Sequence, residues 1–333
     1  MKWTMEGVMD LATAYWRSAA FSAAADVGLF GALEAGPANA AAVAAAASLP
    51  ERHAGELMNA LAAIGVLIRR GDAFEIEPSL RPFVTRAGPS CLLDALRFNA
   101  DLYPLWGRLA DSVRNGRPAL PPSAHLGHDP ERTRRFVLGM HSRAAGLAPA
   151  LLPAVDLRAE RTLLDVGSGP GTFSRRLAEA HADLRVVQFD LPPVLAVAKE
   201  LTEGSPAAAR IVFQPGDYRD PAGDFGAAYD AVLYCGALHQ ESPESAAALF
   251  GRLGRAVNPG GRLIAIDMML QDGQPEPAFA ALFSLNMMLT SPFGRVFETG
   301  AVQRLMEEAG FSGVSCRPIE RIPYFIVEGR KRA

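Results

Sequence analysis

The 333-residue chain has few cysteines and no long apolar run, and each shortage excludes a class of protein. Its three cysteines are widely separated and form no C-x-x-C pair, so neither a disulfide framework nor a structural zinc site is predicted, and no other metal site is expected. No apolar run reaches the ~18 residues that a membrane-spanning helix needs. Acidic residues stand in the N-terminus where a signal peptide is apolar, so the sequence predicts a cytoplasmic protein without a membrane partner.

The chain also lacks a strong charge of either sign. Its formal net charge is −3 at pH 7, which gives no general attraction to nucleic acids or to acidic membranes. Apolar residues make up 49% of the chain, close to the ordinary globular value, so neither disorder nor a fibrous repeat is indicated. A chain of this length can hold two domains with ample core, so we expect a globular protein without a nucleic-acid partner.

The most informative segment is 162–191, which reads TLLDVGSGPGTFSRRLAEAHADLRVVQFDL. An apolar run ends in Asp165, glycines follow at alternate positions, and a helical pattern then leads to a second apolar run that ends in Asp190. This order predicts a strand, a glycine turn, a helix and a second strand, the front half of a nucleotide-binding unit. Glycines let the backbone approach a ligand closely, and an acid at the tip of the second strand can accept both ribose hydroxyl hydrogens. The glycines are Gly167, Gly169 and Gly171.

The spacing of these glycines excludes the dinucleotide fingerprint G-x-G-x-x-G/A. That fingerprint would need a glycine or alanine where Thr172 stands, or a small apolar residue in place of Ser174. The pattern present is D-x-G-x-G-x-G, which resembles motif I of class I S-adenosylmethionine (SAM) methyltransferases.

The first 90 residues have a helical texture that ends in a hairpin. Helices are predicted over 8–33 with a break at Gly28, over 38–47 and over 52–64, and short strands over 66–68 and 74–76. This is a winged-helix arrangement, which often binds DNA. Residues 1–90 contain seven Lys or Arg and nine Asp or Glu, so a surface for a second copy of the chain is favoured over DNA binding.

From residue 160 onward strands alternate with helices, which predicts a parallel sheet covered on both faces. The last two strands are joined by a short turn, so the final strand should run antiparallel. The predicted domains are 1–90, a helical connector over 91–155, and a catalytic domain over 156–333; within the connector, 131–148 is a predicted helix. The predicted strands are 162–166, 185–190, 210–214, 230–235, 262–268, 313–318 and 323–328, and the helices are 172–181, 193–202, 243–257, 276–289 and 298–309.

Several further segments complete a family resemblance that covers nearly the whole chain. They are AADVGLFGALE (24–34), LMNALAAIGVLIRRGDAFEIEPSL (57–80), FDLPPVL (189–195), PGDY (215–218), NPGGRLIAID (258–267) and EEAGF (307–311). With them the chain resembles the SAM-dependent small-molecule O-methyltransferases that carry an N-terminal winged-helix dimerisation domain, such as plant caffeate-type enzymes and bacterial secondary-metabolite relatives. The resemblance implies an α/β class I methyltransferase fold, a seven-stranded sheet with a reversed C-terminal hairpin, and a homodimer.

The resemblance also assigns a cofactor site for SAM, whose product is S-adenosylhomocysteine (SAH). Asp190 would hold the ribose, Asp217 would accept a hydrogen bond from the adenine amino group, and Tyr218 would pack on the adenine ring. A purine needs one directional partner and one flat apolar wall, which fits that pair. The full set of cofactor residues that it implies is Asp165, Gly167, Gly169, Gly171, Asp190, Leu191, Gly216, Asp217, Tyr218 and Cys235.

The general base of the family falls on His239, supported by Asp267. Histidine suits proton removal because its unperturbed pKa lies near working pH. Three departures distinguish the chain: the run is His-Gln-Glu rather than His-Asp-Trp, Cys235 replaces a basic residue, and Val296 falls where a second acid is usual, with Glu298 two residues away. A less supported base would fit an acidic phenol, a carbon nucleophile, or an acceptor that needs little deprotonation.

An acceptor pocket is predicted from apolar residues of two segments. A stripe of this kind forms core more often than pocket, but its methionines and aromatic rings favour a flat aromatic or polyene acceptor. Two alternatives stay open: a C-methyltransferase or a SAM-binding homologue without ordinary O-methyl transfer, and, more distantly, a winged-helix regulator that responds to SAM. The predicted pocket residues are Tyr103, Trp106, Phe136, Met140, Phe283 and Met287.

Overall fold

The computed structural model describes residues 3–121 and 126–332. The chain divides into two compact units, Met1–Pro104 and Leu105–Ala333, and each is considered by itself. No helix in the described ranges combines the length and the apolar character that crossing a bilayer requires.

The first unit begins with helices whose ends follow local chemistry. The side chain of Thr4 accepts a hydrogen bond from the backbone of Gly7 and caps the first helix, and Asn39 caps the third in the same way. Gly28 has a φ of 78°, so the first predicted helix breaks there as expected. The helices are α1 (Met5–Asp26), α2 (Leu29–Ala32), α3 (Ala40–Ala47), α4 (Glu51–Ala63), α5 (Arg81–Val84) and α6 (Leu93–Trp106), whose last two residues belong to the second unit.

The hairpin of the first unit belongs to a three-stranded sheet. Strands β2 (Leu67–Arg70) and β3 (Ala73–Ile76) pair as predicted. A third strand, β1 (Ala38–Asn39), pairs with β3 on its other side, and it occupies residues that the sequence placed in a helix. A strand of two residues is too short to show an alternation of apolar and polar side chains, so β1 is defined by its pairing with β3. Helices and sheet enclose a core that includes Phe30, Met58 and Phe74.

The second unit contains a seven-stranded sheet in the order β6-β5-β4-β7-β8-β10-β9. Strands β4 to β8 are parallel, and β10 runs antiparallel to both of its neighbours, which confirms the reversed final strand. The strands are β4 (Thr162–Val166), β5 (Arg185–Asp190), β6 (Ile211–Pro215), β7 (Tyr229–Cys235), β8 (Val257–Asp267), β9 (Phe311–Pro318) and β10 (Phe325–Lys331).

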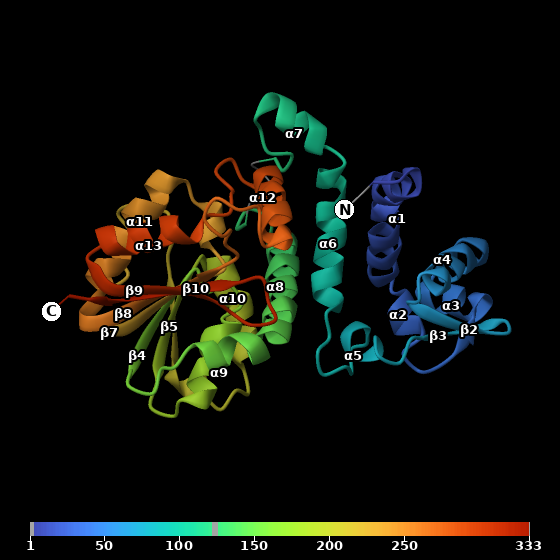
Figure 1. Cartoon of the computed structure of the whole chain (residues 1–333). Coiled ribbons are helices and arrows are strands. Elements are labelled where there is room, and N and C mark those ends of the chain that lie inside the picture. The colour runs from blue at the N-terminus through green and yellow to red at the C-terminus, as the bar shows by residue number, and fades with distance from the viewer. Residues whose placement is uncertain (1–2, 122–125, 333) are drawn as a thin grey trace. The chain divides into compact units, whose positions relative to one another are not determined.

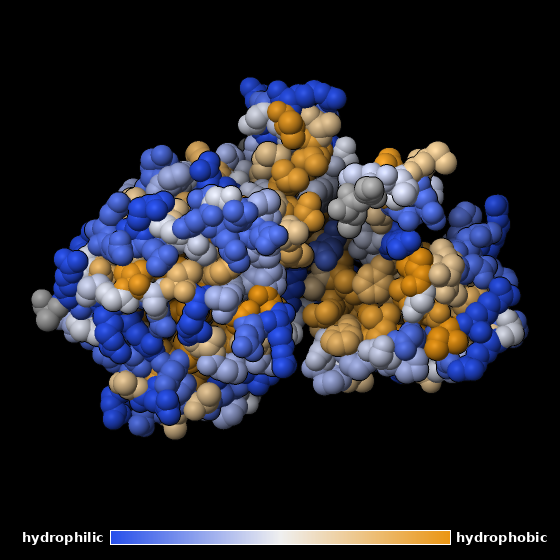
Figure 2. Space-filling model, in the orientation of Figure 1, coloured by the Kyte–Doolittle hydropathy of each residue, from blue (hydrophilic) through white to orange (hydrophobic). Residues whose placement is uncertain are grey.

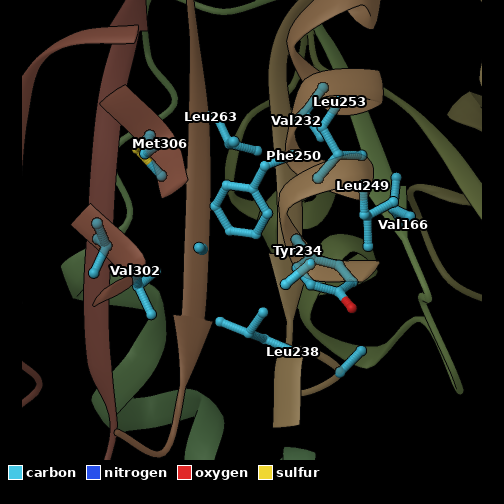
Figure 3. Close-up of a cluster of buried hydrophobic side chains, with 14 of the residues drawn as sticks. Val166, Val232, Tyr234, Leu238, Leu249, Phe250, Leu253, Leu263, Val302 and Met306 are labelled. Atoms are coloured by element: carbon cyan, nitrogen blue, oxygen red, sulfur yellow. The ribbon is translucent and has the colours of Figure 1, made fainter. Parts of the chain in front are cut away.

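Helices cover both faces of this sheet (Figure 1). Successive residues of a strand face opposite sides, so Leu164 joins the core against α11 and α13, whereas Leu163 joins the core against α9. Figure 3 shows the first of these cores, where Phe250 of α11 points toward Leu263 of β8. The helices of this unit are α7 (Leu109–Asn115), α8 (Pro130–Leu151), α9 (Thr172–Ala180), α10 (Pro192–Thr202), α11 (Pro243–Ala256), α12 (Ala278–Thr290) and α13 (Thr299–Glu308), with short 3-10 turns η2 (Leu152–Ala154), η3 (Ala208–Arg210) and η4 (Leu238–Gln240).

The NPGG segment (258–261) differs from the prediction, which placed these residues between the helix over 243–257 and the strand over 262–268. Helix α11 ends at Ala256, and β8 begins at once with Val257, so that Pro259 and Gly260 lie inside β8. Gly260 has a φ of 76°, and the pairing register between β7 and β8 shifts beside it. An irregularity of this kind interrupts a strand locally without ending it.

Candidate functional site

The carboxyl ends of the parallel strands bring the predicted site residues to one edge of the sheet. Strand β4 leads into the glycine turn, β5 ends at Asp190, and β6 ends just before Gly216. Strand β7 leads into η4, which carries His239, and the next strand ends at Asp267. Ligands of open α/β sheets bind outside these carboxyl ends. The fold therefore brings residues that are up to about a hundred positions apart in the chain together at the carboxyl edge of the sheet.

Asp190 is tied directly to the glycine turn. Its carboxylate accepts a hydrogen bond from the backbone nitrogen of Gly169 at 2.7 Å and another from Leu191 at 2.7 Å. Gly167, Gly169 and Gly171 all have positive φ, between 56° and 65°, which glycine adopts at little cost. The acid and the turn thus form one structure in which the carboxylate and the turn backbone lie side by side.

The glycines of this region have different neighbours. Within the described part of the chain, a Cβ on Gly169 would meet no atom within 4 Å, so these residues leave space open beside it. A Cβ on Gly171 would lie 2.1 Å from the side-chain nitrogen of Gln188, and one on Gly216 would lie 2.2 Å from the ring of Phe189. Gly169 therefore leaves room for a ligand, whereas Gly171 and Gly216 allow close packing of the turn and of the β6 end against β5.

Alanine substitutions at Gly171 and Gly169 separate these two roles. Both variants force a positive φ on a residue with a Cβ, which costs about 1–2 kcal/mol. Gly171→Ala also displaces Gln188, so we expect it to lower the free energy of unfolding by about a further 1–3 kcal/mol compared with Gly169→Ala. Chemical denaturation of the two variants measures the difference, and equal stabilities would contradict the packing role of Gly171.

The loop after β6 supplies a flat wall beside the turn. A Cβ on Gly167 would lie 3.2 Å from the ring of Tyr218, so the ring lies against the turn. Tyr218 also contacts Tyr234 edge to face, with ring centroids 5.9 Å apart. Burial raises the pKa of Tyr218 to about 12, so its phenol is neutral near pH 7. Asp217 is exposed at the start of this wall and accepts a hydrogen bond from the backbone of Arg219 at 2.8 Å.

Two buried acids lie beneath the turn. Burial raises the pKa of Asp165 to about 7, although a hydrogen bond with Ser174 opposes the shift. Burial also raises the pKa of Asp190 to about 6, although the backbone donors of Gly169 and Leu191 favour its charged form. A ligand that offers hydroxyl donors or positive charge would stabilise the ionised form of Asp190.

His239 is buried in η4 and is held by Asp267. Its Nδ1 lies 2.8 Å from Oδ1 of Asp267, and its backbone nitrogen donates to Oδ2 at 3.3 Å. A carboxylate only accepts, so Nδ1 carries the hydrogen and Nε2 keeps its lone pair. The ring of Phe283 from α12 packs edge to face against the imidazole, with ring centroids 4.9 Å apart. The imidazole is thus oriented on two sides, with Nε2 as the basic atom.

The departures noted in the sequence have clear structural consequences. Val296 is buried in an apolar cluster with Met268 and Ala280, so no second acid occupies its position. The carboxylate of Glu298 instead accepts a hydrogen bond from the backbone of Gly273 at 3.3 Å. Burial, and then the charges of Asp165 and Asp267, raise the pKa of Cys235 well above its ordinary value, so the thiol stays neutral. At these two positions, an apolar side chain and a neutral thiol stand in place of the charged residues that are usual in the family.

The predicted acceptor residues fall into separate environments. Phe283 contacts His239, and Met287 lies buried one turn later on α12. Trp106 donates from Nε1 to Oδ1 of Asn286 at 3.1 Å, which ties it to the same helix. Phe136 packs beside a cluster between α8 and α10 that also includes Leu191, and Met140 lies one turn further along α8. Tyr103 belongs to the first unit, so its assignment to the pocket stays a prediction.

The sequence interpretation missed Gln188 and Arg219 at this edge, and it considered His141 only as a candidate for the lining of the substrate cavity. Gln188 is fully buried and donates to the carbonyl of Gly171 at 3.2 Å; a polar residue within an apolar strand was its only signal. Nδ1 of His141 lies 2.8 Å from Oγ1 of Thr172 at the start of α9. Arg219 follows Tyr218 in the chain and contacts η4. Within the described ranges, no group of three or more His, Cys, Asp or Glu side chains could hold a metal ion.

Comparison with known proteins identifies the family. The sequence profile of the O-methyltransferase domain matches residues 106–312, and that of the O-methyltransferase dimerisation domain matches residues 9–78. The tetracenomycin polyketide synthesis 8-O-methyl transferase TcmO of Streptomyces glaucescens is 28% identical over 97% of this chain and 96% of its own length. The acetylserotonin O-methyltransferase of Rattus norvegicus is 30% identical over 93% of this chain and 73% of its own length.

A solved structure supports the same assignment. The structure described as PigF with SAH superposes with a TM-score of 0.87 and 26% identity, and the match covers 99% of this chain and all of the other. Together with the two profiles, these relatives support an enzyme rather than a SAM-responsive regulator. The chain therefore belongs to the O-methyltransferase family and is a SAM-dependent methyltransferase that acts on a small metabolite.

Proposed function

We propose that His239 is the general base for methylation of an acceptor hydroxyl. The observation that carries this proposal is the 2.8 Å contact between Nδ1 and Asp267, which leaves Nε2 to take the acceptor proton. SAM supplies a methyl group on a sulfonium centre. As the hydroxyl proton moves to Nε2, an oxygen lone pair forms the new bond to carbon, and the carbon–sulfur electrons stay with sulfur in SAH. Asp267 keeps the imidazole oriented and stabilises the imidazolium.

We propose that the glycine turn and its neighbours hold the cofactor. The open space at Gly169 and the adjacent carboxylate of Asp190 suit the ribose, because the acid can accept from two hydroxyls. The neutral ring of Tyr218 and the exposed carboxylate of Asp217 suit the adenine. Gly167, Gly171, Gly216 and Leu191 would shape this site, and Asp165 and Cys235 would lie beneath it.

The acceptor that we propose is an aromatic hydroxyl compound. Phe283 and Met287 present an aromatic and a thioether surface on the helix that contacts His239. Trp106 is tied to the same helix through Asn286, and Phe136 and Met140 line one side of α8. Two relatives, the tetracenomycin polyketide synthesis 8-O-methyl transferase and the acetylserotonin O-methyltransferase, support an oxygen acceptor.

Incubation with methyl-labelled SAM and a panel of phenols tests this function. We expect label in an ether product of at least one phenol, identified by mass spectrometry, because the histidine can accept its proton. Matched methyl ethers of the same phenols, which have no free hydroxyl, serve as controls. Label on carbon or nitrogen alone would contradict oxygen transfer and favour the C-methyltransferase alternative.

We propose that residues 1–90 form a homodimer interface. Residues 91–155 would connect this interface to the catalytic domain over 156–333. We also propose that the chain has no nucleic-acid partner. Helix α1 exposes several large apolar side chains, including Leu11, Tyr15 and Trp16, and Figure 2 shows apolar residues gathered on one face of this unit. A monomer in sedimentation equilibrium at micromolar concentration would contradict the dimer. Cys91, Cys235 and Cys316 form no disulfide bond, which suits the cytoplasmic location that the sequence predicts.

A further inference from the structure

One arginine joins the two loops that carry the proposed adenine wall and the proposed base. Nη2 of Arg219 donates to Oε1 of Gln240 at 2.5 Å, and its Nε lies 3.5 Å from Oε1 of Glu241. The guanidinium carbon also lies 5.7 Å from the centroid of the Tyr218 ring. Gln240 and Glu241 directly follow His239, so this contact spans 21 positions of sequence to link the end of β6 with η4. We call these three residues, Arg219, Gln240 and Glu241, the clasp.

The acid of the clasp is buried with incomplete hydrogen bonding. Glu241 is 4% exposed, and its Oε2 accepts from Oγ of Ser245 at 2.5 Å. Among the residues that the structure describes, its Oε1 has no hydrogen-bond partner, and it makes an ion-pair contact with Arg219. A buried carboxylate destabilises the fold unless an opposite charge compensates it. The arginine is therefore needed by the acid, although the arginine itself is nearly half exposed.

The loop that carries Tyr218 is held from two directions. Nη1 of Arg252 donates to the carbonyl of Tyr218 at 2.7 Å, and its Nη2 donates to the carbonyl of Gly223 at 2.8 Å. Arg252 belongs to α11 and fixes the backbone of the loop, so the clasp is not required for the loop to fold. The clasp adds a link between the side chains beside the Tyr218 ring and η4.

The clasp also acts on the charges of the proposed cofactor site. Burial opposes ionisation of Arg219, but Tyr218 and Glu241 raise its pKa above the ordinary value, so the guanidinium stays charged. The same charge favours the ionised form of Asp190, against the effect of burial. One side chain thus supports the ribose acid, flanks the adenine wall and contacts the residue next to the base.

We propose that Arg219 is a positioning residue that couples occupancy of the adenine site to the placement of His239 through Gln240 and Glu241. The proposal rests on the cofactor site proposed above. A nucleotide seated on Tyr218 would fix the tyrosine and its neighbouring arginine, and the arginine would in turn fix η4. Removing the guanidinium should therefore weaken nucleotide binding. It should also prevent nucleotide binding from affecting the position of His239.

Calorimetric titration with SAH tests the binding half of this proposal in the full-length protein. We expect Arg219→Gln to weaken SAH binding by about tenfold, because it removes a charged hydrogen-bond donor from the clasp. Glu241→Gln should weaken it by a similar factor, and the double variant should be no weaker than either single variant, as residues of one network are not additive. Arg134→Gln breaks an exposed pair with Glu200 in the same unit and should leave SAH affinity unchanged.

The coupling half is tested by NMR of protein labelled with 15N-histidine. The His239 resonances are assigned by their loss in His239→Gln. In the wild-type protein and in Arg134→Gln we expect saturating SAH to shift these resonances. In Arg219→Gln, at SAH concentrations high enough to saturate the weaker site, we expect the shift to be largely lost.

The outcomes separate this proposal from the cofactor assignment. If SAH binds the wild-type protein and Asp190→Asn weakens it, but Arg219→Gln changes neither affinity nor the His239 response, the cofactor site stands and the coupling is overturned. Weaker binding with an intact His239 response at saturation would also overturn the coupling. If the wild-type protein binds no SAH, both proposals fall.

Discussion

Replacing His239 with glutamine is expected to lower turnover of a phenol acceptor by about 10²–10⁴-fold, the usual contribution of a positioned general base. Glutamine can still donate a hydrogen bond to Asp267, but it cannot accept a proton near pH 7. Because His239 contacts Asp267 and Phe283 rather than the glycine turn, SAH affinity should change little. Turnover is measured with labelled SAM at saturating concentrations, and affinity by calorimetry.

Two further variants define what this loss means. His53→Gln changes an exposed histidine of α4 and should keep full turnover. Asp267→Asn removes the charge that we propose stabilises the imidazolium and fixes the tautomer, so it should lower turnover as well. If His239→Gln kept turnover within about threefold of the wild-type value, well short of the expected loss, the acceptor would not need a protein base. That result would favour an acceptor that is already ionised.

Replacing Asp190 with asparagine is expected to weaken SAH binding by about 100-fold, in line with the loss of charged hydrogen bonds. The carboxylate is proposed to accept from both ribose hydroxyls, and asparagine has only one accepting oxygen. The variant also leaves either Gly169 or Leu191 without its side-chain acceptor, which loosens the turn itself. Asp183→Asn, which changes an exposed acid paired with Arg161 at 3.4 Å, is the matched control and should bind SAH normally.

The pH dependence of SAH binding gives an independent check on Asp190. Its pKa is raised to about 6, so the side chain is mostly ionised above pH 6 and mostly protonated below it. Binding that requires the carboxylate should therefore weaken as the pH falls through 6. Asp165, with a pKa of about 7, titrates nearby, but Asp190→Asn isolates the contribution of Asp190. A variant whose affinity falls with pH as steeply as that of the wild-type protein would contradict the ribose role.

The same direction of shift has a consequence for stability. Burial makes the ionised forms of Asp165 and Asp190 unfavourable in the folded protein, so their protonated forms favour folding. For Asp190 this contribution is complete below the ordinary value of 3.8 and is lost as the pH rises through about 6. A ligand that pairs with the carboxylate offsets this loss at neutral pH.

Local sequence was sufficient to predict a strand or a turn wherever the apolar residues or glycines followed a regular spacing. The strand before Asp165, the glycine turn and the strand before Asp190 were predicted within a residue, because short apolar runs and glycines at fixed spacing act locally. The alternation of strands and helices predicted the parallel sheet, and the short turn between the last two predicted strands predicted the reversed final strand. By contrast, β1 and the strand residues at NPGG were missed, since pairing with distant strands decides them.

What the sequence determined by itself was the fold class. With the family resemblance it also predicted a site at the carboxyl edge of the sheet and the principal residues of that site. What only the tertiary structure decided was which atoms meet: Nδ1 of His239 on Asp267, the turn of Gly169 on Asp190, and Arg219 on Gln240 and Glu241. The physical reason is range. Backbone periodicity and glycine conformations depend on neighbours in the chain, whereas side chains 21 to 28 positions apart touch only once the sheet has aligned the ends of its strands.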